Sequence, residues 1–198
     1  GIAAFKIPSL VTGLRKAGHE VTVIMTRAAT EFISPLTFES LSGNPVYVDM
    51  FASPRHAAVE HIELARRADL FLIAPCTANV LGKLAHGIAD DYLTTTALAV
   101  TCPVVLCPAM DHHMYHHPAV QANLQVLRER GYYLIEPEAG RLASGRHGTG
   151  RLPEPETILV RVAELVPGWE DLLTPGAVTD STATGKPPRS LEGTRVLI

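Results

Sequence analysis

The stretch ADLFLIAPCTANVLGKLAH, residues 68–86, contains the pattern that decides the fold. Its first half holds an unbroken apolar run, Leu70–Ala74, with the length of a buried strand. Its second half, Ala78–His86, spaces apolar residues as one face of a helix does. A short loop with polar side chains, Pro75–Asn79, joins the two. A buried strand, a short loop and a helix form the repeating unit of a parallel sheet covered by helices.

The same alternation extends from Gly1 to about Gly168. The sequence predicts strands at Val21–Thr26, Val46–Asp49, Leu70–Ala74, Val104–Cys107 and Tyr132–Ile135. It predicts helices at Lys6–Ala17, Ala29–Leu41, Ala57–Arg67, Ala78–His86, Asp90–Val100, Pro118–Arg130 and Glu156–Val166. With right-handed crossovers this order gives an α/β fold, a Rossmann-like doubly wound parallel sheet with three flavodoxin-like layers. Such a sheet binds ligands at the carboxyl ends of its strands.

Both ends of the chain depart from this pattern. GIAAFK runs directly into a helix, whereas a doubly wound fold begins with a strand in the middle of its sheet, so we expect a first strand upstream of Gly1. After Trp169 the composition changes to Pro, Gly, Ser and Thr, as in a linker, and RVLI at residues 195–198 has the pattern of another buried strand. We expect a first domain over residues 1–168, a linker over 169–190 and the start of a second domain over 191–198.

Composition excludes several classes of protein. The chain has 198 residues, 46% of them hydrophobic, and a net charge of -3, so it offers no positive field for nucleic acid. Its apolar runs are far shorter than the roughly 20 residues of a membrane helix. The three cysteines are an odd number on apparently buried segments, which indicates a reducing cytoplasm without disulfides.

Four loops fall where this sheet would bind a ligand: GIAAFK, Thr26–Thr30, Pro75–Asn79 and the loop that begins at Pro108. In the third loop, the Thr77 hydroxyl and the Asn79 amide stand at a helix start. They suit a phosphate, because an anion there meets unsatisfied N–H donors and the positive end of the helix dipole. Thr94 and Thr95 would add hydroxyls. The alternative is that these side chains only cap helices.

Five segments, taken in order, resemble the flavin-containing cysteine decarboxylase family. They are GIAAFK (1–6), VIMTRAATEF (23–32), HIELARRADLFLIAPCTANVLGKLAHGIADDYLTT (61–95), PVVLCPAMDHHMY (103–115) and GRLASGRHGTGRLPEPETI (140–158). The resemblance covers nearly all of Gly1 to about Val166, and it is strongest to members that decarboxylate 4′-phosphopantothenoylcysteine in coenzyme A synthesis. It implies an FMN cofactor, that small-molecule substrate, and a homotrimer or multiple of trimers with sites at subunit boundaries. LEGTRVLI resembles the first strand of the ligase that follows this domain in many bacteria.

The resemblance also implies roles for single residues. His61 matches the catalytic histidine beside the flavin, although a lone histidine is more often an ordinary polar residue. The flavin phosphate loop corresponds to Thr77, Ala78 and Asn79, and the first two strand-end loops place Ala3 and Thr26 near the cofactor. Ala109 and Met110 match the loop against the flavin ring, where plain core packing is the alternative for Met110.

The chemistry explains why such a family needs a flavin. A simple cysteine carboxylate loses CO2 with difficulty, because the carbanion left behind has nowhere to place its charge. Oxidation of the thiol-bearing carbon gives a thioaldehyde, which accepts that charge, and decarboxylation then yields an enethiolate that is reduced to a thiol. His61 would manage protons or hold the carboxylate, since histidine titrates near neutral pH.

The sequence departs from the family at two positions. Asp111 stands where the family has an asparagine, and an ionised carboxylate would repel the substrate carboxylate unless it is protonated or turned towards the substrate amide N–H. Ser144 stands where many coenzyme A enzymes carry a cysteine that protonates the enethiol, and serine is a poorer proton donor. Ser144 lies in the segment GRLASGRHGTGRL, residues 140–152, which we call the flap. His147, in the same flap as Ser144, is a candidate replacement. Tyr115 also replaces a tryptophan of the family pattern.

Arg146 and Arg151 are candidates for the substrate phosphate, with Lys83 and Arg141 as weaker ones; the alternative for each is a solvated surface cation. Two rival functions stay open. One is an oxidative peptidyl-cysteine decarboxylase of the same family, which releases an enethiol. The other is a non-catalytic flavin-binding regulatory subunit, although such relatives tend to carry acidic tails and this chain shows none.

The stretch PAMDHHMYHHP, residues 108–118, places four histidines within six residues. His112 and His116 stand four apart, as do His113 and His117, and on a helix each pair would share a face as zinc ligands do. We expect no functional metal, because the segment is predicted to be irregular and no spaced cysteine or carboxylate set completes a site.

Overall fold

The computed structural model describes residues 1–51, 57–172 and 194–198. Its centre is a six-stranded parallel sheet in the order β2-β1-β8-β3-β4-β5. The strands are β1 (Glu20–Ile24), β2 (Val46–Tyr47), β3 (Leu70–Cys76), β4 (Val104–Pro108), β5 (Tyr133–Leu134) and β8 (Arg195–Leu197). All five predicted strands are present, with ends that differ by at most two residues. The predicted doubly wound α/β fold is therefore confirmed.

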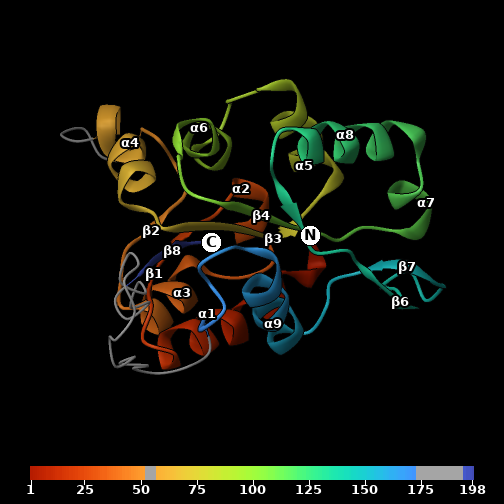
Figure 1. Ribbon diagram of the computed structural model, residues 1–198, viewed down its shortest axis with the longest axis horizontal. Coiled ribbons are helices and arrows are strands. Elements are labelled where there is room, and N and C mark those ends of the chain that lie inside the picture. The colour runs from red at the N-terminus through yellow and green to blue at the C-terminus, as the bar shows by residue number, and fades with distance from the viewer. Residues whose placement is uncertain (52–56, 173–193) are drawn as a thin grey trace, which may run out of the picture.

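Helices cover both faces of the sheet (Figure 1). On one face lie α4 (Ala57–Arg67), α5 (Ala78–His86), α6 (Tyr92–Ala99) and α8 (Pro118–Glu129), and on the other lie α1 (Ile7–Lys16), α3 (Pro35–Ser42) and α9 (Pro155–Leu165). Shorter helices are η1 (Ile2–Lys6), α2 (Arg27–Thr30) and α7 (His112–Tyr115). An antiparallel hairpin, β6 (Glu138–Arg141) and β7 (His147–Arg151), stands apart from the main sheet beneath α7.

The alternation of side chains along β3 divides the core into two layers. Leu70 and Leu72 pack with the helices of the first layer, where α1 contributes Leu10. Phe71 and Ile73 pack into the opposite layer, which α5, α6 and α8 cover. Successive side chains of a strand point to opposite faces, so this run is apolar at every position. Each fully buried side chain of this size stabilises the fold by about 1.5–3 kcal/mol.

The central position of the sheet is occupied by β8. Val196 lies opposite Val21 of β1 and Leu70 of β3, and both Val196 and Leu197 are buried. β8 thus holds the place for which we expected a strand upstream of Gly1, and it comes from the segment that we assigned to a second domain. The chain also packs beyond residue 168, because Trp169 and Leu172 are buried in the core. The domain division remains a prediction, and most of the expected linker, residues 173–190, lies outside the described residues.

Three local predictions differ from the structure. The predicted helix Ala29–Leu41 is two helices, because Ser34 before Pro35 adopts an extended conformation and α3 begins at that proline. The hairpin β6–β7 was not predicted as strands. The histidine segment, expected to be irregular, contains one helical turn, α7, which Asp111 caps.

No helix of the described residues is long and apolar enough to span a membrane.

Candidate functional site

A cavity of about 460 Å³ opens at the carboxyl ends of β1, β8 and β3. Its walls include Met25 after β1, Ile198 after β8, and Ala74 and Pro75 near the end of β3. The chain reverses its direction of winding across these central strands, which is where doubly wound sheets hold ligands. The volume lies within the range of roughly 300–1,000 Å³ that small-molecule sites occupy. The sequence-predicted position of the ligand site is thus a real cavity.

Two helix starts meet at one end of this cavity. Thr77 is the N-cap of α5, and its Oγ1 accepts a hydrogen bond from Val80 N at 3.4 Å. Gly1, where η1 begins, lies beside it, since a Cβ built on Gly1 would be 3.6 Å from Cγ2 of Thr77. The N–H groups of a first helical turn have no partner within the helix. Thr77, Asn79 and Gly1 all line the cavity, so this end suits an anion such as a phosphate.

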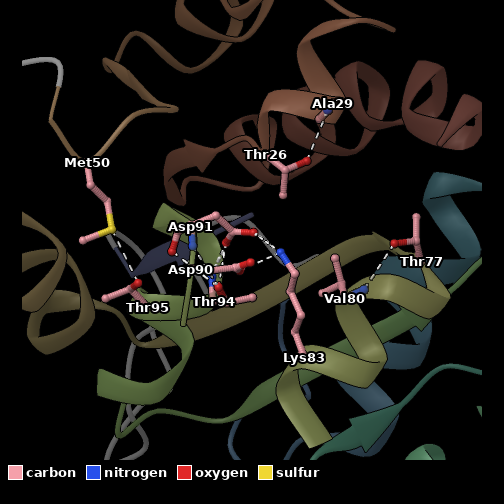
Figure 2. A network of polar contacts seen from close by, with 10 residues as sticks. All are labelled: Thr26, Ala29, Met50, Thr77, Val80, Lys83, Asp90, Asp91, Thr94 and Thr95. Atoms are coloured by element: carbon pink, nitrogen blue, oxygen red, sulfur yellow. Dashed lines mark hydrogen bonds and ion pairs between the residues drawn. The ribbon is translucent and has the colours of Figure 1, made fainter. Parts of the chain in front are cut away.

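Thr26 also lines the cavity, just after the end of β1. It caps α2, and its Oγ1 accepts from Ala29 N at 3.2 Å (Figure 2). Arg27, the next residue, forms an exposed ion pair with Asp49 at 2.5 Å. The hydrogen bond from the Phe51 N–H, together with this arginine, lowers the pKa of Asp49. Thr26 therefore lies at the cavity, and its cationic neighbour already has an anionic partner.

Lys83 lies within the cavity wall, and two aspartates hold it. Its Nζ is 2.6 Å from Asp90 and 2.9 Å from Asp91, and Figure 2 shows all three side chains turned towards one another. Hydrogen bonding to Asp90 raises the pKa of Lys83 although partial burial opposes it. Burial acts to raise the pKa of Asp91, but hydrogen bonds from Thr94 and Lys83 outweigh it and lower that pKa. The lysine charge is matched twice, which makes Lys83 a poor partner for a phosphate.

Thr94 and Thr95, predicted near the cofactor, do not line the cavity. Thr94 is buried and forms a capping box with Asp91 at the start of α6. The Thr95 hydroxyl donates to Sδ of Met50 at 3.5 Å (Figure 2). Met50 itself lines the cavity, so Thr95 acts there only through that side chain.

His61 and Tyr92 carry the two buried side-chain polar atoms that have no hydrogen-bond partner in the described part of the chain. They are Nδ1 of His61 and the hydroxyl of Tyr92. The rings meet edge to face with centroids 6.5 Å apart. Tyr92 lines the cavity, whereas His61, on α4, is not among the residues that line it. Sequence reasoning missed Tyr92, because an aromatic residue in a helix has the same pattern whether its hydroxyl has a function or the ring only packs.

The predicted ring-contacting loop lies next to the hairpin rather than in the cavity wall. Ala109 N donates to Cys76 O at 3.0 Å, and Met110 N donates to Gly150 O at 3.0 Å. Ala3 is partly buried against the core, and its neighbour Ala4 lines the cavity. Ala78 sits in the first turn of α5 between two cavity residues.

The hairpin β6–β7 approaches this loop so closely that only glycine fits. A Cβ on Gly150, whose φ is +147°, would lie 2.0 Å from Met110 O. A Cβ on Gly148 would lie 2.7 Å from the His112 ring. Thr149 N, between the two glycines, donates to His112 Nδ1 at 3.1 Å. The hairpin is therefore docked on residues 110–112.

Asp111 and Ser144 meet across the same contact. The Ser144 hydroxyl donates to Asp111 Oδ2 at 3.2 Å, and His113 N donates to Oδ1 at 3.0 Å. The His113 N–H, with smaller effects from Ser144 and Arg146, lowers the pKa of Asp111. A lowered pKa favours the ionised carboxylate, and therefore the alternative in which Asp111 turns towards the substrate amide N–H. His147 is exposed at the start of β7.

The two predicted phosphate-binding arginines differ. Arg151 donates to Glu154, which Lys6 Nζ also contacts at 2.9 Å. Arg146 is exposed, and its charge acts on Asp111. Within the described residues Arg146 is therefore the less engaged of the two.

The histidines of the segment 112–117 have individual contacts. His112 accepts from the hairpin, and His117 Nδ1 accepts from Ala119 N as the N-cap of α8. The rings of His112 and His116 lie 4.4 Å apart. No group of three or more potential metal ligands occurs among residues 1–51, 57–172 and 194–198.

Comparison with known proteins identifies the family of this site. The profile named Flavoprotein matches residues 1–166. The chain belongs to the Flavoprotein family. The cavity fits a flavin, because apolar walls such as Ile73 and Val80 adjoin a helix start at Thr77 that suits a phosphate.

Several curated relatives of this Flavoprotein family chain have names that place them in coenzyme A synthesis. The coenzyme A biosynthesis bifunctional protein CoaBC of Bacillus subtilis (strain 168) is 54% identical over 164 residues, which are 83% of this chain and 40% of the relative. The chain thus spans about two fifths of the bifunctional relatives that it matches. The probable phosphopantothenoylcysteine decarboxylase of Streptococcus mutans is 44% identical over 165 residues, 82% of this chain and 92% of the relative.

A solved structure shares the fold of this Flavoprotein family chain. A PPC decarboxylase mutant complexed with pantothenoylaminoethenethiol is 34% identical, with a TM-score of 0.70 over 81% of this chain and 90% of that chain. This likeness confirms the flavodoxin-like arrangement of sheet and helices.

Proposed function

We propose that this chain is an FMN-dependent decarboxylase that converts 4′-phosphopantothenoylcysteine to 4′-phosphopantetheine in coenzyme A synthesis. The observation that carries the proposal is the strand-end cavity with the Thr77 helix start, in a chain that belongs to the Flavoprotein family. The names of the curated relatives supply the substrate. The three cysteines are free, which agrees with an enzyme of the reducing cytoplasm.

The FMN phosphate would bind at the Thr77–Asn79 end of the cavity. That end offers helix N–H donors, whereas Lys83 at another wall is neutralised by Asp90 and Asp91. Thr26 lines the cavity and would lie along the rest of the cofactor, whereas contacts from Ala3, Ala109 and Met110 follow from the resemblance alone, because these residues lie outside the cavity wall. When bound, FMN supplies a two-electron acceptor and donor for the thiol-bearing carbon of the substrate.

His61 would hold or transfer a proton next to the substrate. Its Nδ1 is buried and has no partner, so this nitrogen is free to accept a hydrogen bond in the loaded site. Asp111 is ionised and would accept from the substrate amide N–H, because a carboxylate has only acceptors to offer. The substrate carboxylate is then kept away from it.

The flap leaves the final reduction step without a thiol. The Ser144 hydroxyl is engaged with Asp111, so we propose His147, which is exposed three residues along, as the proton donor to the enethiol. The same engagement of Ser144 favours a second candidate, in which the chain releases the enethiol unreduced and an external oxidant such as dioxygen takes the two electrons removed from the substrate. Arg146 is the better candidate for the substrate phosphate, because Arg151 pairs with Glu154.

We also propose that the chain forms a trimer or a multiple of trimers. Three of its five phenylalanines expose much of their surface, with Phe5 at 62%, Phe32 at 46% and Phe51 at 86%. Exposed apolar side chains mark a surface that a partner covers where they gather into one patch, so the proposal predicts that these three phenylalanines lie at the subunit contacts.

The purified protein tests these proposals. We expect a yellow protein that releases FMN on denaturation and that turns over 4′-phosphopantothenoylcysteine, with product identified by mass spectrometry. 4′-Phosphopantetheine supports the first candidate, and a product short of two hydrogen atoms supports enethiol release.

His61→Asn should bind FMN yet lose turnover. A protein that takes up FMN but consumes no substrate would contradict the decarboxylase proposal, and His147→Gln with unchanged product would exclude His147 as proton donor.

A further inference from the structure

Two unpaired polar atoms in neighbouring rings need an explanation. Nδ1 of His61 and the hydroxyl of Tyr92 are both buried without a partner. A buried polar atom without a partner lowers the free energy of unfolding by about 1–3 kcal/mol. The rings meet edge to face, 6.5 Å between centroids, from helices α4 and α6 that pack together. Two unpartnered atoms on rings in contact are a candidate hydrogen-bonded pair, which a change in the side-chain torsions of His61 or in χ1 of Tyr92 would join.

The chemical roles of the two atoms are complementary. Burial, followed by the charge of Glu60 and the presence of Tyr47, raises the pKa of Tyr92. The Tyr92 hydroxyl therefore stays protonated and can donate. Nδ1 of a neutral imidazole can accept, and the ring proton then sits on Nε2.

Other groups around the pair have partners of their own. Glu60 precedes His61 on α4 and hydrogen-bonds Tyr47, the other tyrosine of the cluster. The Tyr47 ring packs against Tyr92 at 5.3 Å. Tyr92 is 2% exposed, and it alone of these four lines the large cavity. Of these four residues, a ligand bound in the cavity would therefore contact only Tyr92, and its effect on His61 would pass through the Tyr92 side chain.

We propose that Tyr92 is a positioning residue for His61: its hydroxyl donates to Nδ1 when the cavity is filled, which fixes the Nε2–H tautomer and holds the imidazole in place. The proposal rests on the proposed function for the role of His61. Tyr92 itself takes no proton from the substrate.

The test compares two variants that each remove one hydroxyl. Tyr92→Phe deletes the proposed donor, and Tyr47→Phe is the matched control from the neighbouring ring. Ring-labelled histidine NMR, with and without FMN, reports the tautomer, and the signal of His61 is identified by its loss in His61→Asn. We expect the Nε2–H form in FMN-loaded wild type and in Tyr47→Phe, and a mixture of tautomers in Tyr92→Phe.

The kinetics give a second readout. Tyr92→Phe should lower kcat by about tenfold or more, because a misplaced catalytic group costs up to about a hundredfold. KM should change by less than about twofold, since the proposed partner of the Tyr92 hydroxyl is His61 and not the substrate. An unchanged His61 tautomer in FMN-loaded Tyr92→Phe, or an equal kcat loss in Tyr47→Phe, overturns the proposal. If Tyr92→Phe does not fold, Tyr92→Leu takes its place. If wild type has no turnover, the proposed function fails while the tautomer comparison still decides the pair.

Discussion

At the scale of single residues, Gly150 decides whether the hairpin can dock. Gly150→Ala would place a Cβ 2.0 Å from Met110 O, and φ is +147° there. We expect this change to lower the free energy of unfolding by about 2–3 kcal/mol and to reduce turnover, because the backbone of β7 must move away. Urea denaturation and the decarboxylation assay measure the two effects.

Gly145→Ala is the matched control in the same hairpin. Its φ is +80°, but no atom lies within 4 Å of the added Cβ. It should cost only the backbone strain of about 1 kcal/mol. Equal losses in both variants would show that backbone conformation, and not the close approach to Met110, matters at position 150.

Residue roles were harder to predict than residue positions. Thr26 and Thr77 were placed correctly at the cavity, because a polar residue after a buried strand lies at the sheet edge by geometry. Thr94 was not, since its hydroxyl serves a helix cap and the sequence pattern of a cap resembles that of a phosphate loop. The contact between Ser144 and Asp111 depends on the docking of the hairpin, which no local pattern describes.

At the scale of elements, the start of α6 depends on a charged cap. Asp91 accepts from Thr94 N at 2.8 Å and contacts Lys83. Asp91→Ala should lower the free energy of unfolding by about 1 kcal/mol at pH 7. Asp91→Asn keeps a capping oxygen but removes the charge, so it should cost less.

The pH dependence of this cap has a definite sign. The pKa of Asp91 is lowered in the folded protein below its ordinary value of 3.8. The carboxylate therefore adds stability that is fully present above about pH 4 and is lost as pH falls through the folded pKa. The advantage of wild type over Asp91→Asn in urea denaturation should shrink below about pH 4. An advantage that grows on acidification would contradict this assignment.

Elements with strong periodicity were predicted well, and short ones were not. α5 was predicted with both ends correct because Thr77 caps it and Gly87 ends it in a left-handed conformation. The break between α2 and α3 could have been found from Pro35. The strands of the hairpin are rich in glycine and charge, so they lack the apolar alternation by which strands are recognised.

At the scale of the whole molecule, assembly is the property most open to a direct test. We expect sedimentation equilibrium to give three times the mass of one chain, or a multiple of that, with the exposed Phe5, Phe32 and Phe51 buried at the subunit contacts. A dilution series separates a stable trimer from weak association. A monomer at all concentrations would contradict the proposed assembly.

The fold class was predicted from the sequence, but the order of the strands in the sheet was not. The alternation of buried strands and helices predicted a doubly wound parallel sheet, since few topologies satisfy right-handed crossovers. That β8 lies between β1 and β3 could not be predicted, because a buried apolar strand carries no mark of which strands it pairs with. In the folded chain β8 pairs with β1 and β3, and this position buries Val196 and Leu197.

A metal ion bound to His112 would affect the hairpin, because His112 Nδ1 accepts a hydrogen bond from Thr149 N. A divalent ion bound to Nε2 of a neutral imidazole leaves the ring proton on Nδ1. Nδ1 would then be a donor facing another donor, and the hydrogen bond that holds the hairpin would be lost. Nickel or zinc bound to His112 and His116 would therefore weaken the docking of the hairpin β6–β7 on residues 110–112.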